Sequence, residues 1–169
     1  MKIKAITRIS LFTALMCVCS LVIPKILLFG IPITLQTLII MLIGDVLKPK
    51  EAFLSVVLYL IIGLIGIPVF SGFNSGLAAF LGPTGGFLIA FPFATLGISL
   101  LKGKSIIHLI IVNILFGVIF TYSIGVISIA YHNQISYFNA YKTMLIFIPF
   151  DLLKAVIASL IAKRIKLDF

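Results

Sequence analysis

The sequence contains few of the side chains on which catalysis and metal binding usually depend. Its 169 residues include four Asp or Glu, two His and two Cys. The two cysteines, Cys17 and Cys19, lie two positions apart in one apolar run, where helical geometry keeps them from facing each other. They match no metal-ligand spacing. No Gly-x-Ser-x-Gly, His-Glu-x-x-His or Ser/His/Asp arrangement is present either. We therefore predict no enzyme, no catalytic residue and no metal site.

The sequence also lacks a recognisable energy source. The segment closest to a phosphate-binding loop, 97–105, has five residues between its glycines where the motif needs four. A proton relay would need a series of acids and histidines along the membrane spans. Asp45 and Glu51 instead lie near the inner surface, and His108 and His132 fall at opposite membrane faces. The sequence therefore gives little support to a proton-coupled pump.

Apolar residues are what the chain has in abundance. They make up 62% of it, charged residues make up 10%, and the mean hydropathy is +1.34. Soluble domains are about 45–50% apolar and about 25% charged. A water-soluble fold of this size could not bury so much apolar surface, so lipid is the expected solvent for most of it. We predict an all-α integral membrane protein in which residues 1–169 form a single transmembrane domain.

Six apolar segments approach the length of about 20 residues that crosses a bilayer. Proline ends two of them, since Pro24 follows the first and Pro68 the third. The expected spans are residues 5–23, 34–47, 52–67, 84–101, 106–130 and 141–162, and the second of these is short.

The placement of the basic residues supports this count. The net charge is +9, but the basic residues form short clusters between apolar segments and not a stripe with interleaved aromatics, so no nucleic-acid partner is expected. With six spans and a cytoplasmic N-terminus, ten of the 13 basic residues lie inside, two lie outside, and Lys154 falls within the last span. The positive-inside rule then favours six spans with both termini cytoplasmic. No A-x-A site follows the basic N-terminus, so the first helix is expected to be retained.

The segment 68–83, PVFSGFNSGLAAFLGP, is unusual because it carries no charge. It is too apolar for a solvated loop and too rich in Gly and Pro for a regular helix. Irregular backbone at membrane depth is tolerated where protein buries it or where it lines a cavity. Two interpretations stay open: a plug or lid over a binding site, and a re-entrant turn that only packs between helices.

The sharpest feature is a charged pair, Asp151 and Lys154, in the last span. Lys154 lies nine residues before Lys163, which places it about 13–14 Å from the inner basic cluster. A charge at such a depth costs roughly 2.5–3.5 kcal/mol and usually marks a ligand or ion path. Three residues apart, the two side chains share a helix face. They would suit a ligand with one carboxylate, neutralised by Lys154, and N–H donors, accepted by Asp151. The alternative is an ion pair that only joins helices.

Two side-chain amides are weaker candidates. Asn74 lies in the uncharged segment, where an amide could both donate to and accept from a cyclic urea or amide. A lone Asn among glycines is also common turn chemistry. Gln36, at the start of the second span, could bond a ligand or another helix, and the sequence does not separate these.

Small and polar residues recur every four positions on the fifth span, at Asn113, Gly117, Thr121 and Gly125. This spacing puts them on one face, where small residues allow helices to approach closely. We interpret the stripe as a helix-packing surface.

Five short segments together resemble the BioY family, the substrate-binding components of energy-coupling-factor biotin transporters. They are LFTAL at 11–15, PITLQT at 32–37, YLIIGLIGIPVF at 59–70, GPTGGFL at 82–88 and DLLK at 151–154. The resemblance covers nearly the whole chain, and the order of the segments carries it. Two departures are visible. Phe87 stands where the family pattern has Tyr, and the Ala-x-x-x-Ala stripe of the first helix is reduced to Ala14 and Val18.

The resemblance implies a six-helix bundle that holds biotin near the outer face. In such proteins the Asp-x-x-Lys pair and an Asn of the loop after the third span contact biotin, which here are Asp151, Lys154 and Asn74. We add four further residues to the expected ligand site, namely Gln36, Tyr59, Phe73 and Phe87.

The implied function is capture of biotin outside the bacterial cell membrane and its delivery inward. The expected partners are a transmembrane coupling protein, which the first helix would meet, and two ATPase subunits, with biotin as ligand and no cofactor. Two other interpretations stay open. One is a capture subunit for another vitamin or for a biotin precursor such as dethiobiotin. The other is a membrane structural or assembly protein in which Asp151 and Lys154 only join helices.

Overall fold

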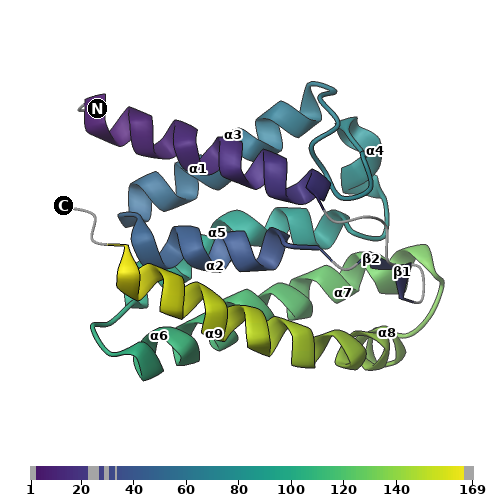
Figure 1. Cartoon of the computed structure of the whole chain (residues 1–169). Coiled ribbons are helices and arrows are strands. Elements are labelled where there is room, and N and C mark those ends of the chain that lie inside the picture. The colour runs from purple at the N-terminus through teal and green to yellow at the C-terminus, as the bar shows by residue number, and fades with distance from the viewer. Residues whose placement is uncertain (1–2, 23–26, 29–30, 33, 166–169) are drawn as a thin grey trace.

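The computed structural model describes residues 3–22, 27–28, 31–32 and 34–165, and these form an elongated bundle of helices (Figure 1). Lys2, Pro24, Lys25 and Lys166, on which part of the predicted topology depends, lie outside the described residues. The helices of the first half are α1 (Ile3–Val22), α2 (Gln36–Val46), α3 (Pro49–Leu64), α4 (Gly76–Leu81) and α5 (Gly85–Leu101). The second half has α6 (Ile106–Val112), the π-helix η1 (Asn113–Phe120), α7 (Thr121–His132), α8 (Tyr137–Met144), the 3₁₀ turn η2 (Leu145–Phe147) and α9 (Ile148–Arg164).

The all-α prediction holds for almost all of the described chain. Three stretches are long and apolar enough to cross a membrane, namely Ile3–Leu21, Ile106–His132 and Tyr137–Arg164, and α2 and α5 are shorter apolar helices. One element was not predicted. The short strands β1 (Leu27–Leu28) and β2 (Ile31–Pro32) pair antiparallel between α1 and α2.

The last predicted span, 141–162, is not one helix. It is divided between α8, the 3₁₀ turn η2 and α9. Pro149 lies in the first turn of α9, and because proline has no N–H it cannot continue a hydrogen-bond ladder from the preceding helix. The break matters for the site, because Phe147 in η2 is buried and Asp151 falls in the first turn of α9.

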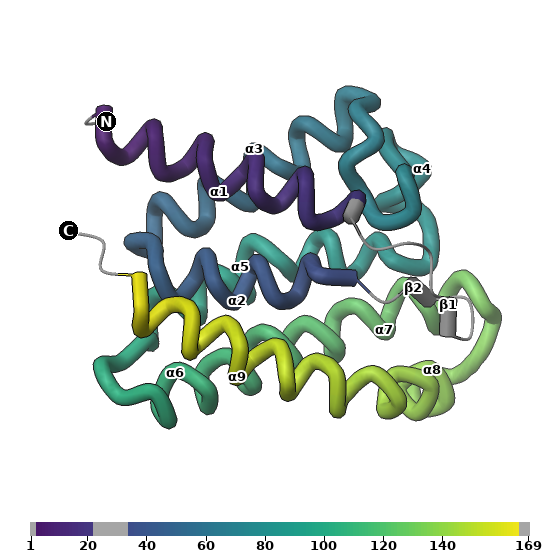
Figure 2. The backbone as a smooth tube through the Cα atoms, in the orientation of Figure 1, coloured from purple at the N-terminus to yellow at the C-terminus, as the bar shows by residue number. Residues whose placement is uncertain are grey.

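The two ends of the bundle differ in what they carry (Figures 1 and 2). The start of α1, the α2–α3 and α5–α6 connections and the end of α9 lie together at one end. The strands, α4 and α8 lie at the other end. Most basic residues of the described chain belong to elements at the first end, and we call it the basic end: Lys4, Arg8, Lys48, Lys50, Lys102, Lys104, Lys163 and Arg164.

Helix α5 lies at the centre of the bundle, where it packs against α2, α3 and α7, and α2 packs in turn against α9. Small residues make the approach close. A Cβ atom added to Gly117 would lie 2.4 Å from Met41, and one added to Gly125 would lie 2.4 Å from the Phe87 ring. Both glycines belong to the predicted small-residue stripe, so its interpretation as a packing surface is confirmed.

The uncharged segment 68–83 folds back over α5 and α3. It starts with a bridge between Phe70 and Asn74 and continues as α4, which contacts both helices. Its return to the bundle requires glycine at position 85, where a Cβ atom would lie 1.8 Å from the carbonyl oxygen of Phe80. The segment is therefore held in place by packing, and it also forms part of a pocket wall.

Candidate ligand pocket

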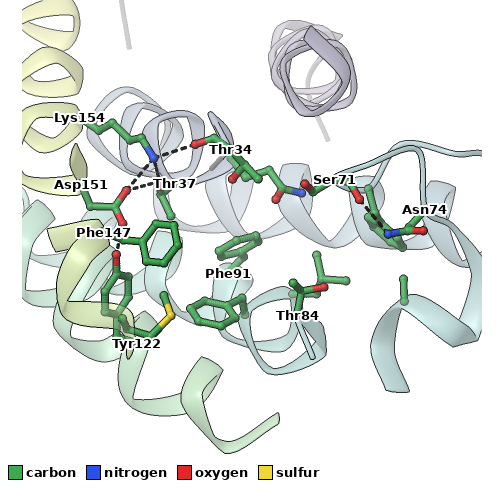
Figure 3. Close-up of a pocket in the computed structure, with 16 residues that line it drawn as sticks. Thr34, Thr37, Ser71, Asn74, Thr84, Phe91, Tyr122, Phe147, Asp151 and Lys154 are labelled. Carbon is green, nitrogen blue, oxygen red and sulfur yellow. Dashed lines mark hydrogen bonds and ion pairs between the residues drawn. The ribbon is translucent and has the colours of Figure 1, made fainter. Parts of the chain in front are cut away.

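A pocket opens between this segment and helices α2, α5, α7 and α9 (Figure 3). Apolar side chains form most of its wall, and polar groups are few. The apolar members are Phe70, Ala79, Phe87, Leu88, Phe91, Met144 and Phe147. The polar members are Thr34, Gln36, Thr37, Ser71, Asn74, Thr84, Tyr122, Asp151 and Lys154. An apolar concavity with a small set of directed polar groups is the usual form of a small-molecule site.

Asp151 is the centre of a buried hydrogen-bond network at one side of the pocket. Asp151 is only 4% exposed. The Oδ1 atom accepts from the Thr37 hydroxyl at 2.8 Å and from the Lys154 ammonium at 2.8 Å. The Oδ2 atom accepts from the Tyr122 hydroxyl. We call Thr37, Tyr122, Asp151 and Lys154 the outer network. It joins α2, α7 and α9.

Lys154 completes the outer network with all three of its ammonium hydrogens. Besides Asp151, the Nζ atom donates to the Thr34 carbonyl oxygen at 2.7 Å and to the Thr37 hydroxyl at 3.1 Å. Its side chain is 14% exposed. A charged pair buried in this way is supported by hydrogen bonds on each side, as buried charges require.

The aromatic side chains are fixed by edge-to-face contacts. Phe87 meets Tyr122 with ring centroids 6.1 Å apart, and Phe70 meets Tyr59 at 5.4 Å and Phe80 at 5.6 Å. Such contacts stabilise one ring orientation beyond the burial of area. The apolar wall is therefore preformed.

The two amides of the sequence prediction both line the pocket, in different settings. Gln36 is buried, and its Nε2 atom donates to the Tyr59 hydroxyl at 2.5 Å. Asn74 is exposed and donates to the Ser71 carbonyl oxygen at 3.0 Å, which is turn chemistry. Figure 3 shows Asn74 at the side of the pocket opposite Asp151 and Lys154.

Two predicted site residues do not reach the pocket wall. Tyr59 is fully buried, and its hydroxyl contacts Ser20 at 3.2 Å, Gln36 and the Val69 carbonyl oxygen at 3.1 Å. Phe73 is 65% exposed, and its φ of 61° places it at the tip of the turn. Tyr59 therefore contacts the pocket wall through Gln36 and Phe70, while Phe73 does not belong to the wall.

The structure adds residues that sequence reasoning missed. Thr37 belongs to the PITLQT segment, but only its neighbour Gln36 was singled out. Tyr122 follows Thr121 of the small-residue stripe, and the π-helix before it shifts the face that each residue presents. The sequence signal that could have pointed to Tyr122 is its phenol hydroxyl next to the small-residue stripe.

Comparison with known proteins agrees with the sequence motifs. The model of the BioY family matches residues 1–169. The chain belongs to the BioY family. It is 39% identical to the probable biotin transporter BioY of Bacillus subtilis over 170 residues, covering 98% of this chain and 91% of the relative. It is also 39% identical to the probable biotin transporter BioY of Pyrococcus horikoshii, covering 98% of both chains.

A solved structure also matches the fold. It is a crystal structure of the S-component for biotin from an ECF-type ABC transporter, with a TM-score of 0.87 and 34% identity. The match covers 96% of this chain and 90% of that one. BioY relatives are named as transporters and not as enzymes, so the absence of a catalytic arrangement in the sequence agrees with family membership.

Proposed function

We propose that this BioY chain captures biotin at the outer face of the bacterial plasma membrane and delivers it inward. A coupling protein and two ATPase subunits would supply the energy, since the sequence has no nucleotide-binding loop of its own. Biotin is the ligand, and no resident cofactor is proposed. The names of its relatives and of the matching S-component support this assignment.

The proposed topology has six spans in a single domain, residues 1–169, with both termini in the cytoplasm. The gathering of basic residues at one end of the bundle supports it, because the positive-inside rule makes that end cytoplasmic. Ala79 of α4 and Met144 of α8 line the pocket, so the pocket would lie toward the outer end of the bundle.

One observation carries the proposal: a buried acid and a half-buried amine stand side by side at one end of an aromatic pocket. A cyclic urea presents an N–H next to a C=O along one edge. Asp151 can accept from that N–H, and Lys154 can donate to that C=O. Rings of Phe87 and Phe91 offer apolar surface to the bicyclic body of biotin.

The same geometry bears on which end of biotin meets the pair. Asp151 Oδ1 and Lys154 Nζ are 2.8 Å apart, so both contact the same end of any ligand. A ligand carboxylate on Lys154 would lie beside the Asp151 carboxylate, and like charges repel at this separation. We therefore propose that the ureido end meets the pair and that the carboxylate lies toward exposed Asn74. This orientation is the reverse of the sequence prediction, in which Lys154 neutralises the ligand carboxylate.

Binding must replace one existing contact of Lys154, because its three hydrogens already have acceptors. The Thr34 carbonyl is a neutral acceptor from the segment that precedes α2, whereas Thr37 and Asp151 also bond each other. We propose that the ligand's carbonyl oxygen takes the place of Thr34. The exchange would couple ligand entry to the start of α2.

Equilibrium binding of labelled biotin to the purified chain in lipid nanodiscs tests the proposal directly. We expect saturable binding of one biotin per chain, and weaker competition by dethiobiotin, which lacks the sulfur-containing ring. Tighter binding of dethiobiotin or of another vitamin would change the assigned substrate. No saturable binding of any of them would leave the outer network as a helix-joining device.

The proposed orientation predicts how amidation of the biotin carboxylate and the substitution Lys154→Ala together change the affinity. Replacing the carboxylate of biotin with a neutral amide should change affinity by the same factor in the native chain and in Lys154→Ala, because independent sites add. Dissociation constants of biotin and biotinamide for both proteins form the complete cycle. If Lys154→Ala removed the difference between the two ligands, the carboxylate would contact Lys154.

A further inference from the structure

A second buried polar cluster lies between α2, η1 and α9, nearer the basic end. Asn113, the first residue of η1, donates from its Nδ2 atom to Asp45 Oδ2 at 2.8 Å and to the Ser159 hydroxyl oxygen at 3.0 Å. Ser159 in turn donates to the Ala155 carbonyl oxygen at 2.8 Å. We call Asp45, Asn113 and Ser159 the inner network. Asp45 is 8% exposed, and the other two are fully buried.

Every hydrogen in the inner network is in use, and two oxygen atoms remain without a partner. The Asn113 amide donates both of its hydrogens, and the Ser159 hydroxyl donates its single hydrogen. Among the buried side-chain atoms of the described residues, Asp45 Oδ1 and Asn113 Oδ1 have no hydrogen-bond partner. Both atoms are acceptors, and leaving a buried acceptor unpaired costs about 1–3 kcal/mol. What the cluster lacks is a donor.

Among the described residues, no cation forms an ion pair with the Asp45 carboxylate. Neither ion pair between described residues, Arg8 with Glu51 or Lys154 with Asp151, includes Asp45. The elements packed against α2 carry Lys4 and Arg8 on α1, Lys48, Lys50 and Glu51 before and on α3, Lys102 after α5, and Asp151, Lys154, Lys163 and Arg164 on α9. Lys102 acts on Asp45 by its charge, while its ammonium donates to the Leu47 carbonyl oxygen at 2.6 Å. Helix η1 has no ionisable side chain.

We propose that Asp45 and Asn113 form a proton-binding site, in which the neutral Asp45 carboxyl and the Asn113 amide pair as acid and amide. A proton on Asp45 Oδ1 would provide the missing donor, and the unpaired Asn113 Oδ1 would be its acceptor. Rotating the Asn113 amide by half a turn does not remove the need, because its oxygen would then face Asp45 Oδ2. A carboxyl buried without a directly paired cation also becomes neutral on general grounds.

The position of the site gives the proton a structural role. The inner network joins α2, η1 and α9, and the outer network joins α2, α7 and α9, with α7 continuing directly from η1. Thr37 and Asp45 are eight positions apart, whereas Asn113 and Tyr122 are nine positions apart. The π-helix begins at Asn113 and accommodates an extra residue, as such segments do, often at functional sites. The bound proton thus holds together the elements that form the pocket. One held proton is not a relay, so this site does not make the chain a proton pump.

Infrared spectroscopy of the whole chain in lipid nanodiscs tests the site without using biotin. At neutral pH we expect the carbonyl-stretch band of a protonated carboxyl group, shifted when aspartate carboxyls carry ¹³C. The chain has three aspartates and one glutamate, so the label separates Asp from Glu without any substitution. Asp45→Asn should abolish the band, and the controls Glu51→Gln and Asp151→Asn should keep it.

The outcomes separate this proposal from its rivals. Absence of a protonated-carboxyl band in the native chain would mean that water or a monovalent cation satisfies the two oxygens, and the proposal would be wrong. A label-sensitive band that survived Asp45→Asn would assign the proton to Asp151 or Asp168. If Asp45→Asn fails to fold, the labelled native chain and the labelled Asp151→Asn variant decide instead. Loss of the band in Asp151→Asn would assign the proton to Asp151 and contradict the site. None of these results depends on biotin binding.

Discussion

Replacing Asp151 or Lys154 with alanine is expected to weaken biotin binding by about 2–5 kcal/mol, which is about 30-fold or more in the dissociation constant. Each substitution removes one ligand contact and also leaves the other charge buried with too few partners. Asp151→Ala should be the more harmful, because Thr37 and Tyr122 lose their shared acceptor as well. Equilibrium binding of biotin to the three purified proteins measures the effect.

A control and a double variant decide whether the pair acts on ligand or only on the fold. Lys142→Ala removes an exposed lysine that lies over the Phe138 ring, outside the pocket wall, and should leave affinity unchanged. Thermal unfolding without biotin reports the structural part. If the Asp151→Ala/Lys154→Ala double variant unfolded while each folded variant kept native affinity, the pair would be a helix-joining device and not a ligand site.

The substitution Gly63→Ala is expected to disturb the opposite wall of the pocket and lower affinity at least about tenfold, a change of about 1.4 kcal/mol. An added Cβ atom would lie 2.0 Å from Phe70 Cζ, so the Phe70 ring must leave its place. That ring lines the pocket and is packed edge-to-face on Tyr59 and Phe80. Its movement therefore also disturbs Tyr59, which holds Gln36 at 2.5 Å.

Gly97→Ala is the matched control for Gly63→Ala. Its Cβ atom would lie 2.4 Å from the Phe116 ring, which does not belong to the pocket wall. Overpacking of this kind costs typically about 1–3 kcal/mol of stability wherever it occurs. Both variants should melt earlier than the native chain, and only Gly63→Ala should bind biotin weakly. Equal affinity losses in the two variants would show that the effect is general destabilisation.

Much of the fold could be predicted because its signals are local. Apolar length, proline positions and basic clusters predicted helices close to α1, α2, α3 and α5, and the stretch from α6 to α7. The charged pair stood out because Asp and Lys are costly within an apolar span. The family motifs then supplied the expected substrate. These features depend on residues that are neighbours in sequence or lie on one helix face.

The rest depends on contacts between distant parts of the chain. Asp151 is held by Thr37, which is 114 positions away, and by Tyr122, 29 positions away. Helical spacing on α9 cannot reveal either partner. The π-helix changes the face that residues after Asn113 present, and no simple sequence pattern marks it. The same reasoning applies to Tyr59 and Phe73, which lie outside the pocket wall because of packing and turn geometry that residue type does not reveal. A contact of either residue with the ligand stays a prediction.

An experimental structure of this chain with biotin bound tests both the proposed substrate and the role of the outer network. We expect the ureido ring within hydrogen-bond distance of both Asp151 and Lys154, the ring body against Phe87 and Phe91, and the carboxylate toward Asn74. Biotin bound elsewhere, with Asp151 and Lys154 contacting only each other and their present protein partners, would contradict it.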